Sequence, residues 1–202
     1  MSRIKSALEL ALEKTEGVES NSEKLREHER RQDGKRLLAK FYQQLQEGIE
    51  TKQAQKQLKK GFSDYPAHEQ QWVRQGFREV LLAGLTLPQD DSSLSRLDTT
   101  VLAAVAASSK QGSVETLFEQ TQQIFSQYLQ EKTQLIENLR QQFAPRIRQK
   151  EEAYAKQTGQ RITIDPASDP EFQQYLQQAM EQLQDHYMQV VQQIRDQLSQ
   201  LL

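Results

Sequence analysis

The chain has 202 residues, of which 36% are hydrophobic and 27% are charged, and its mean hydropathy of -0.83 is polar for a globular protein. A formal net charge of -2 excludes a global basic field of the kind that favours nucleic acid or an anionic membrane. The chain has no cysteine, so it forms no disulfide, and we expect a reducing, cytoplasmic location.

The scarcity of helix breakers indicates the fold class. The chain has only 8 Gly and 5 Pro, and about one residue in six is Gln, a good helix former. We therefore predict an all-α fold, an antiparallel helical bundle with long coiled-coil-like helices that form a projecting hairpin. The predicted divisions are an N-terminal docking helix and linker at 1–22, a helical bundle at 23–143 and the projecting hairpin at 144–202, whose last helix folds back.

The first segment, residues 3–15, is predicted to be a short helix that ends at Gly17. Its apolar residues share one face and are Ile4, Leu8, Ala11 and Leu12. Glu9 and Glu13 lie within this pattern, so the segment is neither a signal peptide nor a membrane span. We expect the helix to dock on the bundle or on a partner.

Residues 4–15 read Ile-Lys-Ser-Ala-Leu-Glu-Leu-Ala-Leu-Glu-Lys-Thr. This run resembles the start of an uncharacterised bacterial family that is known only as a domain of unknown function. The resemblance covers the N-terminal residues alone and implies no activity, cofactor or partner.

A second helix is predicted from the capping pair Ser20 and Glu23 to about Lys60, with a candidate break at Asp33-Gly34. Two basic tracts, 24–40 and 52–60, define an alternative function as a nucleic-acid-associated protein. The residues that would contact phosphate are Arg26, Arg30, Arg31, Lys35 and Arg36. Interleaved carboxylates cancel much of their field and no aromatic residue is placed for stacking, so a solvated helix face is the favoured interpretation.

A third helix is predicted after Ser63 or Asp64, with Pro66 in its first turn. Trp72 lies among apolar residues and is interpreted as a core residue rather than a ligand platform. Gly76 and Gly84 lie near the same face, where a missing side chain allows another backbone to approach. The next helix, 94–110, is rich in small residues and is expected in the centre of the bundle.

The organising element is the stretch 113–156, in which apolar residues follow one helical period. Doubled positions such as Leu117/Phe118 and Leu135/Ile136 widen the apolar arc beyond a two-position coiled-coil seam. One partner helix would not cover this arc, so at least two helices are expected to pack on it. Pro145 lies inside the pattern and predicts a kink or break.

The stretch 158–169 is predicted to be a loop tip, from which Ile162 and Ile164 dock on another surface. Asp169 is the predicted N-cap of the last helix. That helix carries a coiled-coil repeat of alternating steps of four and three, at Phe172, Leu176, Ala179, Leu183, His186 and Val190, followed by a shift of register.

No catalytic, cofactor or metal site is predicted. The three histidines lack a second ligand at metal spacing, and the sequence contains no Gly-rich phosphate loop and no nucleophile motif. His186 is interpreted as a structural seam residue. The favoured function is a non-catalytic helical interaction or scaffold protein that binds a protein partner or itself through coiled-coil contacts. The candidate partner-binding residues are Ile162, Ile164, Phe172, Leu176, Leu183 and Val190.

Overall fold

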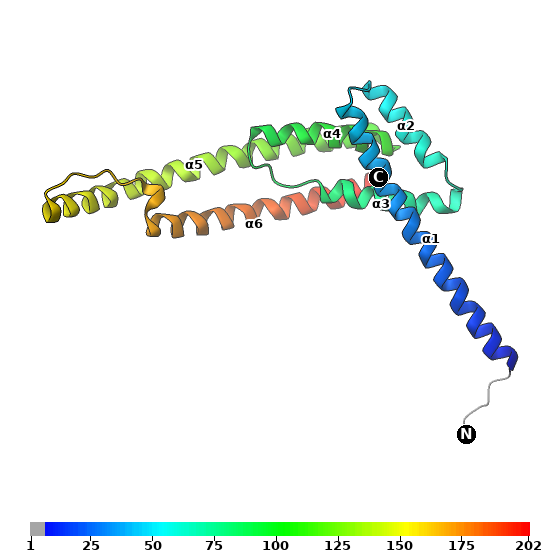
Figure 1. Cartoon of the computed structure of the whole chain (residues 1–202). Helices are drawn as coiled ribbons and strands as arrows, with labels where there is room; N and C mark the ends of the chain where they lie inside the picture. Colours follow the sequence, from blue (N-terminus) through cyan, green and yellow to red (C-terminus); the bar gives the residue numbers. More distant parts are fainter. Residues whose placement is uncertain (1–6) are drawn as a thin grey trace. The chain divides into compact units, whose positions relative to one another are not determined.

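The computed structural model describes the backbone of residues 7–202 and the side chains from residue 22 onward (Figure 1). Within this range the chain is helical, contains no strand, and confirms the predicted all-α fold. The helices are α1 (Ala7–Gln46), α2 (Thr51–Ser63), α3 (Ala67–Ala83), α4 (Asp91–Ala107), α5 (Gln111–Thr158) and α6 (Pro170–Leu201), and a short 3-10 turn, η1, spans Pro166–Ser168.

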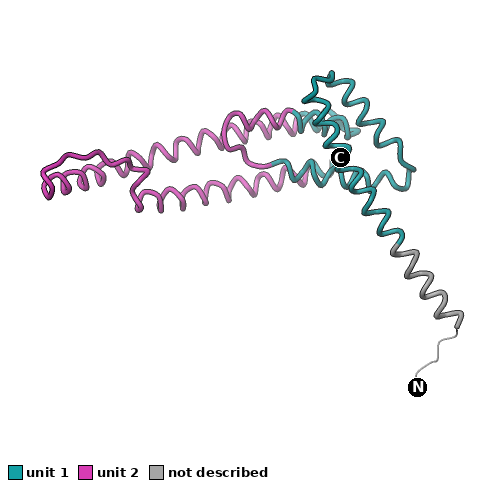
Figure 2. The backbone as a smooth tube through the Cα atoms, viewed as in Figure 1, with its two compact units in different colours: residues 1–85, 99–115, 198–202 teal, residues 86–98, 116–197 magenta. Residues whose placement is uncertain are grey.

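The chain divides into two compact units (Figure 2). Unit 1 comprises residues 1–85, 99–115 and 198–202, and unit 2 comprises residues 86–98 and 116–197. One boundary follows residue 85, after α3, and the others fall inside α4, α5 and α6, so most of α5 belongs to the same unit as most of α6. The predicted divisions at 22 and 143 stay predictions.

Helix α1 is one continuous element, so the predicted end at Gly17 and the candidate break at Asp33-Gly34 are wrong. A glycine inside a helix costs only about 1 kcal/mol, which neighbouring turns and tertiary contacts offset. The chain reverses instead at Gly48, whose φ of 79° is accessible to glycine. The predicted helix from Glu23 to Lys60 is therefore two helices. The side chains of the predicted docking helix lie outside the described residues.

Helices α1 and α3 in unit 1 cross at two glycines. A Cβ on Gly34 would lie 1.9 Å from the Val73 carbonyl oxygen, and a Cβ on Gly76 would lie 1.9 Å from the Arg31 carbonyl oxygen. The close approach predicted at Gly76 is confirmed, whereas a Cβ on Gly84 would make only ordinary contacts. The two backbones thus touch where side chains would separate them.

The core of unit 1 surrounds this crossing. Its fully buried side chains include Leu38, Phe41, Val73 and Phe77. The end of α4 also lies in this core, with Ala103 and Ala104 fully buried, as expected for a helix of small residues.

Two arginines of α3 hold the carboxyl ends of other helices in unit 1. Arg74 Nη1 donates to the Ala107 carbonyl oxygen at 2.9 Å, and Arg78 Nη1 donates to the Ser199 carbonyl oxygen at 3.2 Å. Cations at helix carboxyl ends complement the helix dipole and satisfy carbonyl groups that have no intrahelical partner. Helix α3 is therefore the element on which the ends of α4 and α6 are fixed.

In unit 2, α5 and α6 pair in an antiparallel arrangement. The ring of Tyr128 contacts Tyr187 at a centroid distance of 5.1 Å, and the ring of Phe143 contacts Phe172 at 5.4 Å. The steps from Tyr128 to Phe143 and from Tyr187 back to Phe172 are equal in length, so the register is constant along the pair. Pro145 lies inside α5 and does not break it.

The buried stripe of α6 differs from the predicted repeat beyond Leu183. Tyr187 and Val191 are buried, His186 is exposed, and Val190 is half-buried. The assignment of His186 to the seam is therefore wrong. Successive steps of four carry the buried face around the helix, because four residues advance more than one turn.

Candidate interaction surfaces

The seam between α5 and α6 ends in a compact aromatic cluster. Leu139, Phe143 and Phe172 are buried against one another, and the partly buried residues around them are Leu135, Leu176 and Ala179. Phe143 is also in edge contact with Tyr175 at 5.5 Å, although Tyr175 remains 48% exposed. The residues at the centre of the seam are therefore buried, whereas those along its sides are partly exposed to solvent.

The structure distributes the six predicted partner-binding residues over three environments. Phe172 is buried in the aromatic cluster, so it supports the hairpin from inside. Ile162 is exposed. The other four residues, which are half-buried, are Ile164, Leu176, Leu183 and Val190. On α6, Leu176, Leu183 and Val190 follow one edge of the seam.

The loop between α5 and α6 is held to α5 by a backbone contact. The Ile164 amide donates to Glu151 Oε1 at 2.7 Å. Ile162 and Tyr154 nearby are 37% and 40% exposed. Ile164 thus lies against the hairpin, while Ile162 is 37% exposed.

Asp169 closes the loop as the predicted N-cap of α6. Its Oδ1 accepts hydrogen bonds from the Glu171 and Phe172 amides at 3.0 and 3.2 Å, and Oδ2 is ion-paired with Lys150. The hydrogen bond from Lys150 lowers the pKa of the Asp169 carboxyl group, and the backbone hydrogen bonds act in the same direction against desolvation. The carboxylate form therefore fixes the start of α6.

Tyr187 places a phenol group in the seam beside Tyr128. Burial, together with a hydrogen bond and a charge interaction with Glu131, raises the pKa of Tyr187 to about 12. The phenol is consequently a neutral hydrogen-bond donor at physiological pH, and this contact suits structure rather than acid–base chemistry.

Four cationic residues of the α1 tract are paired with carboxylates within unit 1. Arg30 pairs with Glu69 and Asp33, Arg31 pairs with Glu27 and Glu79, Lys35 pairs with Glu79, and Arg36 pairs with Asp33. Hydrogen bonds to Glu69 and Asp33 raise the pKa of Arg30. Of the five predicted phosphate contacts, Arg26 alone is exposed without such a described partner. The tract offers little positive field to an anion.

The lysines of α2 differ from those of α1. Lys52, Lys56, Lys59 and Lys60 are exposed, and within residues 22–202 none of them makes an ion pair. Helix α2 itself contains no acidic residue. Its outer face is therefore a row of uncompensated positive charge.

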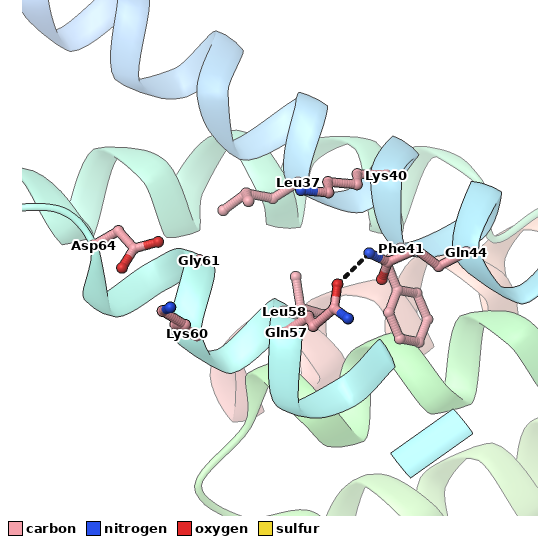
Figure 3. Close-up of a pocket in the computed structure, with 9 residues that line it drawn as sticks. All are labelled: Leu37, Lys40, Phe41, Gln44, Gln57, Leu58, Lys60, Gly61 and Asp64. Carbon is pink, nitrogen blue, oxygen red and sulfur yellow. Dashed lines mark hydrogen bonds between the residues drawn. The ribbon is translucent and has the colours of Figure 1, made fainter. Parts of the chain in front are cut away.

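A groove of about 320 Å³ lies between α1 and α2 next to these lysines (Figure 3). The apolar side chains that line the groove are those of Leu37, Phe41 and Leu58. The side-chain amide nitrogen of Gln44 donates a hydrogen bond to the side-chain oxygen of Gln57 across the groove. The polar rim contains Lys40, Lys60 and Asp64.

The sequence pattern does not predict this groove, although Gly61 lies in its wall. The sequence predicts a helix end at about Lys60, just before Gly61, but α2 continues to Ser63. A Cβ at this position would lie 2.7 Å from Leu37 Cδ2. The glycine therefore leaves room for the Leu37 side chain in the wall of the groove.

The described residues contain no cluster of three His, Asp or Glu side chains that would hold a metal ion. Trp72 is half-buried on α3. Among the same residues, every helix is too short or too polar to cross a membrane.

Comparison with known proteins places the chain in a family. Residues 59–200, more than half of the chain, match the model of a family of unknown function (DUF6657). No curated protein and no solved structure matches the chain. The expectation of a domain of unknown function is confirmed, although the match excludes residues 4–15, on which the resemblance was based. The chain belongs to this family of unknown function.

Proposed function

We propose that the protein is a non-catalytic helical interaction protein that self-associates through the α5–α6 hairpin. The observation that carries the proposal is the half-buried apolar edge of the seam at Leu176, Leu183 and Val190. Apolar surface that two helices leave accessible favours contact with a further helix.

The outer surface of the hairpin supports a second copy as the partner. Helix α6 has few charged residues and carries Gln at most exposed positions, so two copies meet without strong charge repulsion. Glutamine side chains also donate and accept hydrogen bonds, which allows one α6 helix to satisfy another.

The test replaces the apolar edge without disturbing the buried centre. In Leu183→Gln/Val190→Gln, we expect the dissociation constant for self-association to rise at least tenfold, measured by size-exclusion chromatography with light scattering. The matched control is Met188→Gln, because Met188 is 45% exposed on another side of α6. Its self-association should be unchanged. A wild-type protein that stays strictly monomeric at high concentration would refute the proposal.

The nucleic-acid alternative receives less support than the sequence alone suggested. Arg30, Arg31, Lys35 and Arg36 are engaged with carboxylates of unit 1, and phosphate binding would have to displace these partners. Salt-dependent binding of labelled RNA or DNA that is lost in Arg30→Gln/Arg31→Gln would revive this function.

A further inference from the structure

The outward face of α2 concentrates positive charge. At 100° per residue, the lysines of this helix fall within one arc of about 100°, and they are Lys52, Lys56, Lys59 and Lys60. The residues that α2 buries lie on its other side and are Ala54, Leu58 and Phe62. All four lysines are exposed, and none makes an ion pair with a described residue. The face is therefore free to bind an anionic ligand.

Nothing within α2 offsets the repulsion between these charges. Lys52, Lys56 and Lys60 follow one another at intervals of four residues, a spacing at which like charges destabilise a helix. The helix contains no acidic residue, and the acids that flank it, Glu50 and Asp64, occupy its two cap positions without an ion pair to any described lysine. A bound anion would relieve this repulsion and stabilise the helix.

The spacing of the lysines suits a ligand whose negative charges repeat. At 1.5 Å per residue, neighbouring lysines in the row are about 6 Å apart along the helix axis. An ammonium group only donates hydrogen bonds, so it requires an acceptor, and a charged acceptor binds it most strongly. The backbone of a nucleic-acid duplex carries one negative charge per about 1.7 Å of its axis, so one duplex can neutralise several lysines of the row and release counterions.

An anionic membrane fits this face less well than a nucleic acid. A helix that binds in a membrane interface buries apolar side chains among the lipids. The apolar residues of α2 are already buried within unit 1, and the exposed residues beside the lysines are Gln53 and Ser63. These side chains are polar and can donate hydrogen bonds to phosphate oxygens.

The same face has no group that would read bases. The aromatic residue of α2 is Phe62, which is buried and in edge contact with Phe77 at a centroid distance of 5.2 Å. It therefore offers no platform on which a base could stack. Contacts to phosphate groups alone fix the position of a nucleic acid but carry no sequence information.

We infer that the outward face of α2 binds the phosphate backbone of a nucleic acid, without sequence preference, through the ammonium groups of its four lysines. The inference goes beyond the proposed function, because the face belongs to unit 1 and does not require the hairpin to associate. It also differs from the alternative that uses the arginines of α1, since those arginines are engaged with carboxylates.

The salt dependence of binding tests the inference directly. A short fluorescent DNA duplex of mixed sequence is titrated with the full-length chain, and anisotropy is measured at several salt concentrations between about 50 and 200 mM. With four phosphate contacts, we expect the logarithm of the association constant to fall with the logarithm of salt concentration at a slope of about -3 to -4. A duplex of scrambled sequence should bind equally. Absence of saturable binding at the lowest salt concentration would overturn the inference.

The lysine row supplies the variants. In Lys56→Gln/Lys60→Gln, we expect the slope to become shallower by about 2 and binding at about 50 mM salt to weaken at least tenfold. Glutamine is a good helix former and the change removes a repulsion, so circular dichroism should show unchanged helicity. The matched control is Arg148→Gln/Lys156→Gln, which removes two exposed charges of α5 and should leave the slope unchanged. Equal losses in both variants would indicate a general charge effect and overturn the inference.

Two further results would assign the charge to another role. Binding that persists in Lys56→Gln/Lys60→Gln but is lost in Arg30→Gln/Arg31→Gln would place the site on α1 and overturn the inference. So would binding to vesicles that contain phosphatidylserine, if the unmodified chain binds them and the duplex does not.

The hairpin variant separates this inference from the proposed function. Leu183→Gln/Val190→Gln should bind the duplex with the slope of the unmodified chain, because the lysines lie in unit 1. Loss of duplex binding in this variant would overturn the inference. A chain that binds the duplex but never self-associates would refute only the proposed function, whereas a chain that self-associates without binding the duplex would refute only the inference.

Discussion

The α1–α3 crossing and the α5–α6 hairpin are both pairs of helices, and they are closed by different means. The crossing brings two backbones together at Gly34 and Gly76 and surrounds them with ion pairs to Glu69 and Glu79. The hairpin relies on large rings, with Phe143 against Phe172, and leaves its apolar edges half-buried. Where two backbones are in close contact, little apolar surface remains exposed between the helices. Bulky side chains hold two helices further apart, so the apolar residues along the edges of the pair stay accessible to another helix.

The first prediction breaks the crossing. Gly76→Ala places a Cβ 1.9 Å from the Arg31 carbonyl oxygen, and a backbone atom cannot rotate away as a side chain can. We expect destabilisation of roughly 4 kcal/mol or more in urea unfolding, at the upper end for overpacking. Gly112→Ala in the first turn of α5 is the control, because a Cβ there meets nothing within 4 Å. Similar unfolding midpoints for the two variants would contradict the close approach.

The second prediction breaks the hairpin. Phe172→Ala removes a ring that is 1% exposed from the aromatic cluster and should cost about 3 kcal/mol, the lower end for a large aromatic residue, because the open edges let the site collapse. Hydrogen exchange should show lost protection in α6 around residue 172. Tyr154→Ala, an exposed ring on α5, should leave both stability and exchange nearly unchanged.

The third prediction concerns the ion pairs that surround the crossing. Glu69 is buried and pairs with Arg30, so Glu69→Gln should reduce stability by about 1–2 kcal/mol. Arg36 is 80% exposed in its pair with Asp33, and Arg36→Gln should change stability by less than about 0.5 kcal/mol. Equal effects in thermal unfolding would show that burial does not distinguish the two pairs.

The smallest effect is expected at the start of α6, where a change of pH alters the charge of the capping residue Asp169. The pKa of Asp169 is lower in the folded protein than in the unfolded chain, so its stabilisation is present above a pH of about 4 and is lost as pH falls through the folded pKa. Asp169→Asn keeps a side-chain acceptor for the cap and removes the charge. In urea unfolding at pH 2 to 6, the variant should lose this part of the pH dependence, whereas Asp165→Asn, at the exposed cap of η1, should keep it.

The helical content and most helix starts followed from the sequence. The position of α5 and the Asp169 cap depend on local signals, namely an apolar period and a capping side chain, and these act over a few residues. Expectations failed where local and tertiary preferences disagree. Gly17 and Gly34 are permitted helix ends that the chain does not use, and at Gly34 the reason is the backbone of α3, which lies far away in sequence.

The same distinction holds for the interaction surfaces. The sequence by itself determined that this chain is all-α, that apolar residues follow one helical period along α5, and that it has two basic tracts. Only the tertiary structure decided that Arg30 and Lys35 of one tract pair with acids of α3 while the lysines of the other stay unpaired beside a groove. It also decided that α6 turns Tyr187 rather than His186 into the seam. The physical reason is that periodicity fixes which residues share a face, whereas the charge and burial of that face depend on what distant segments place against it.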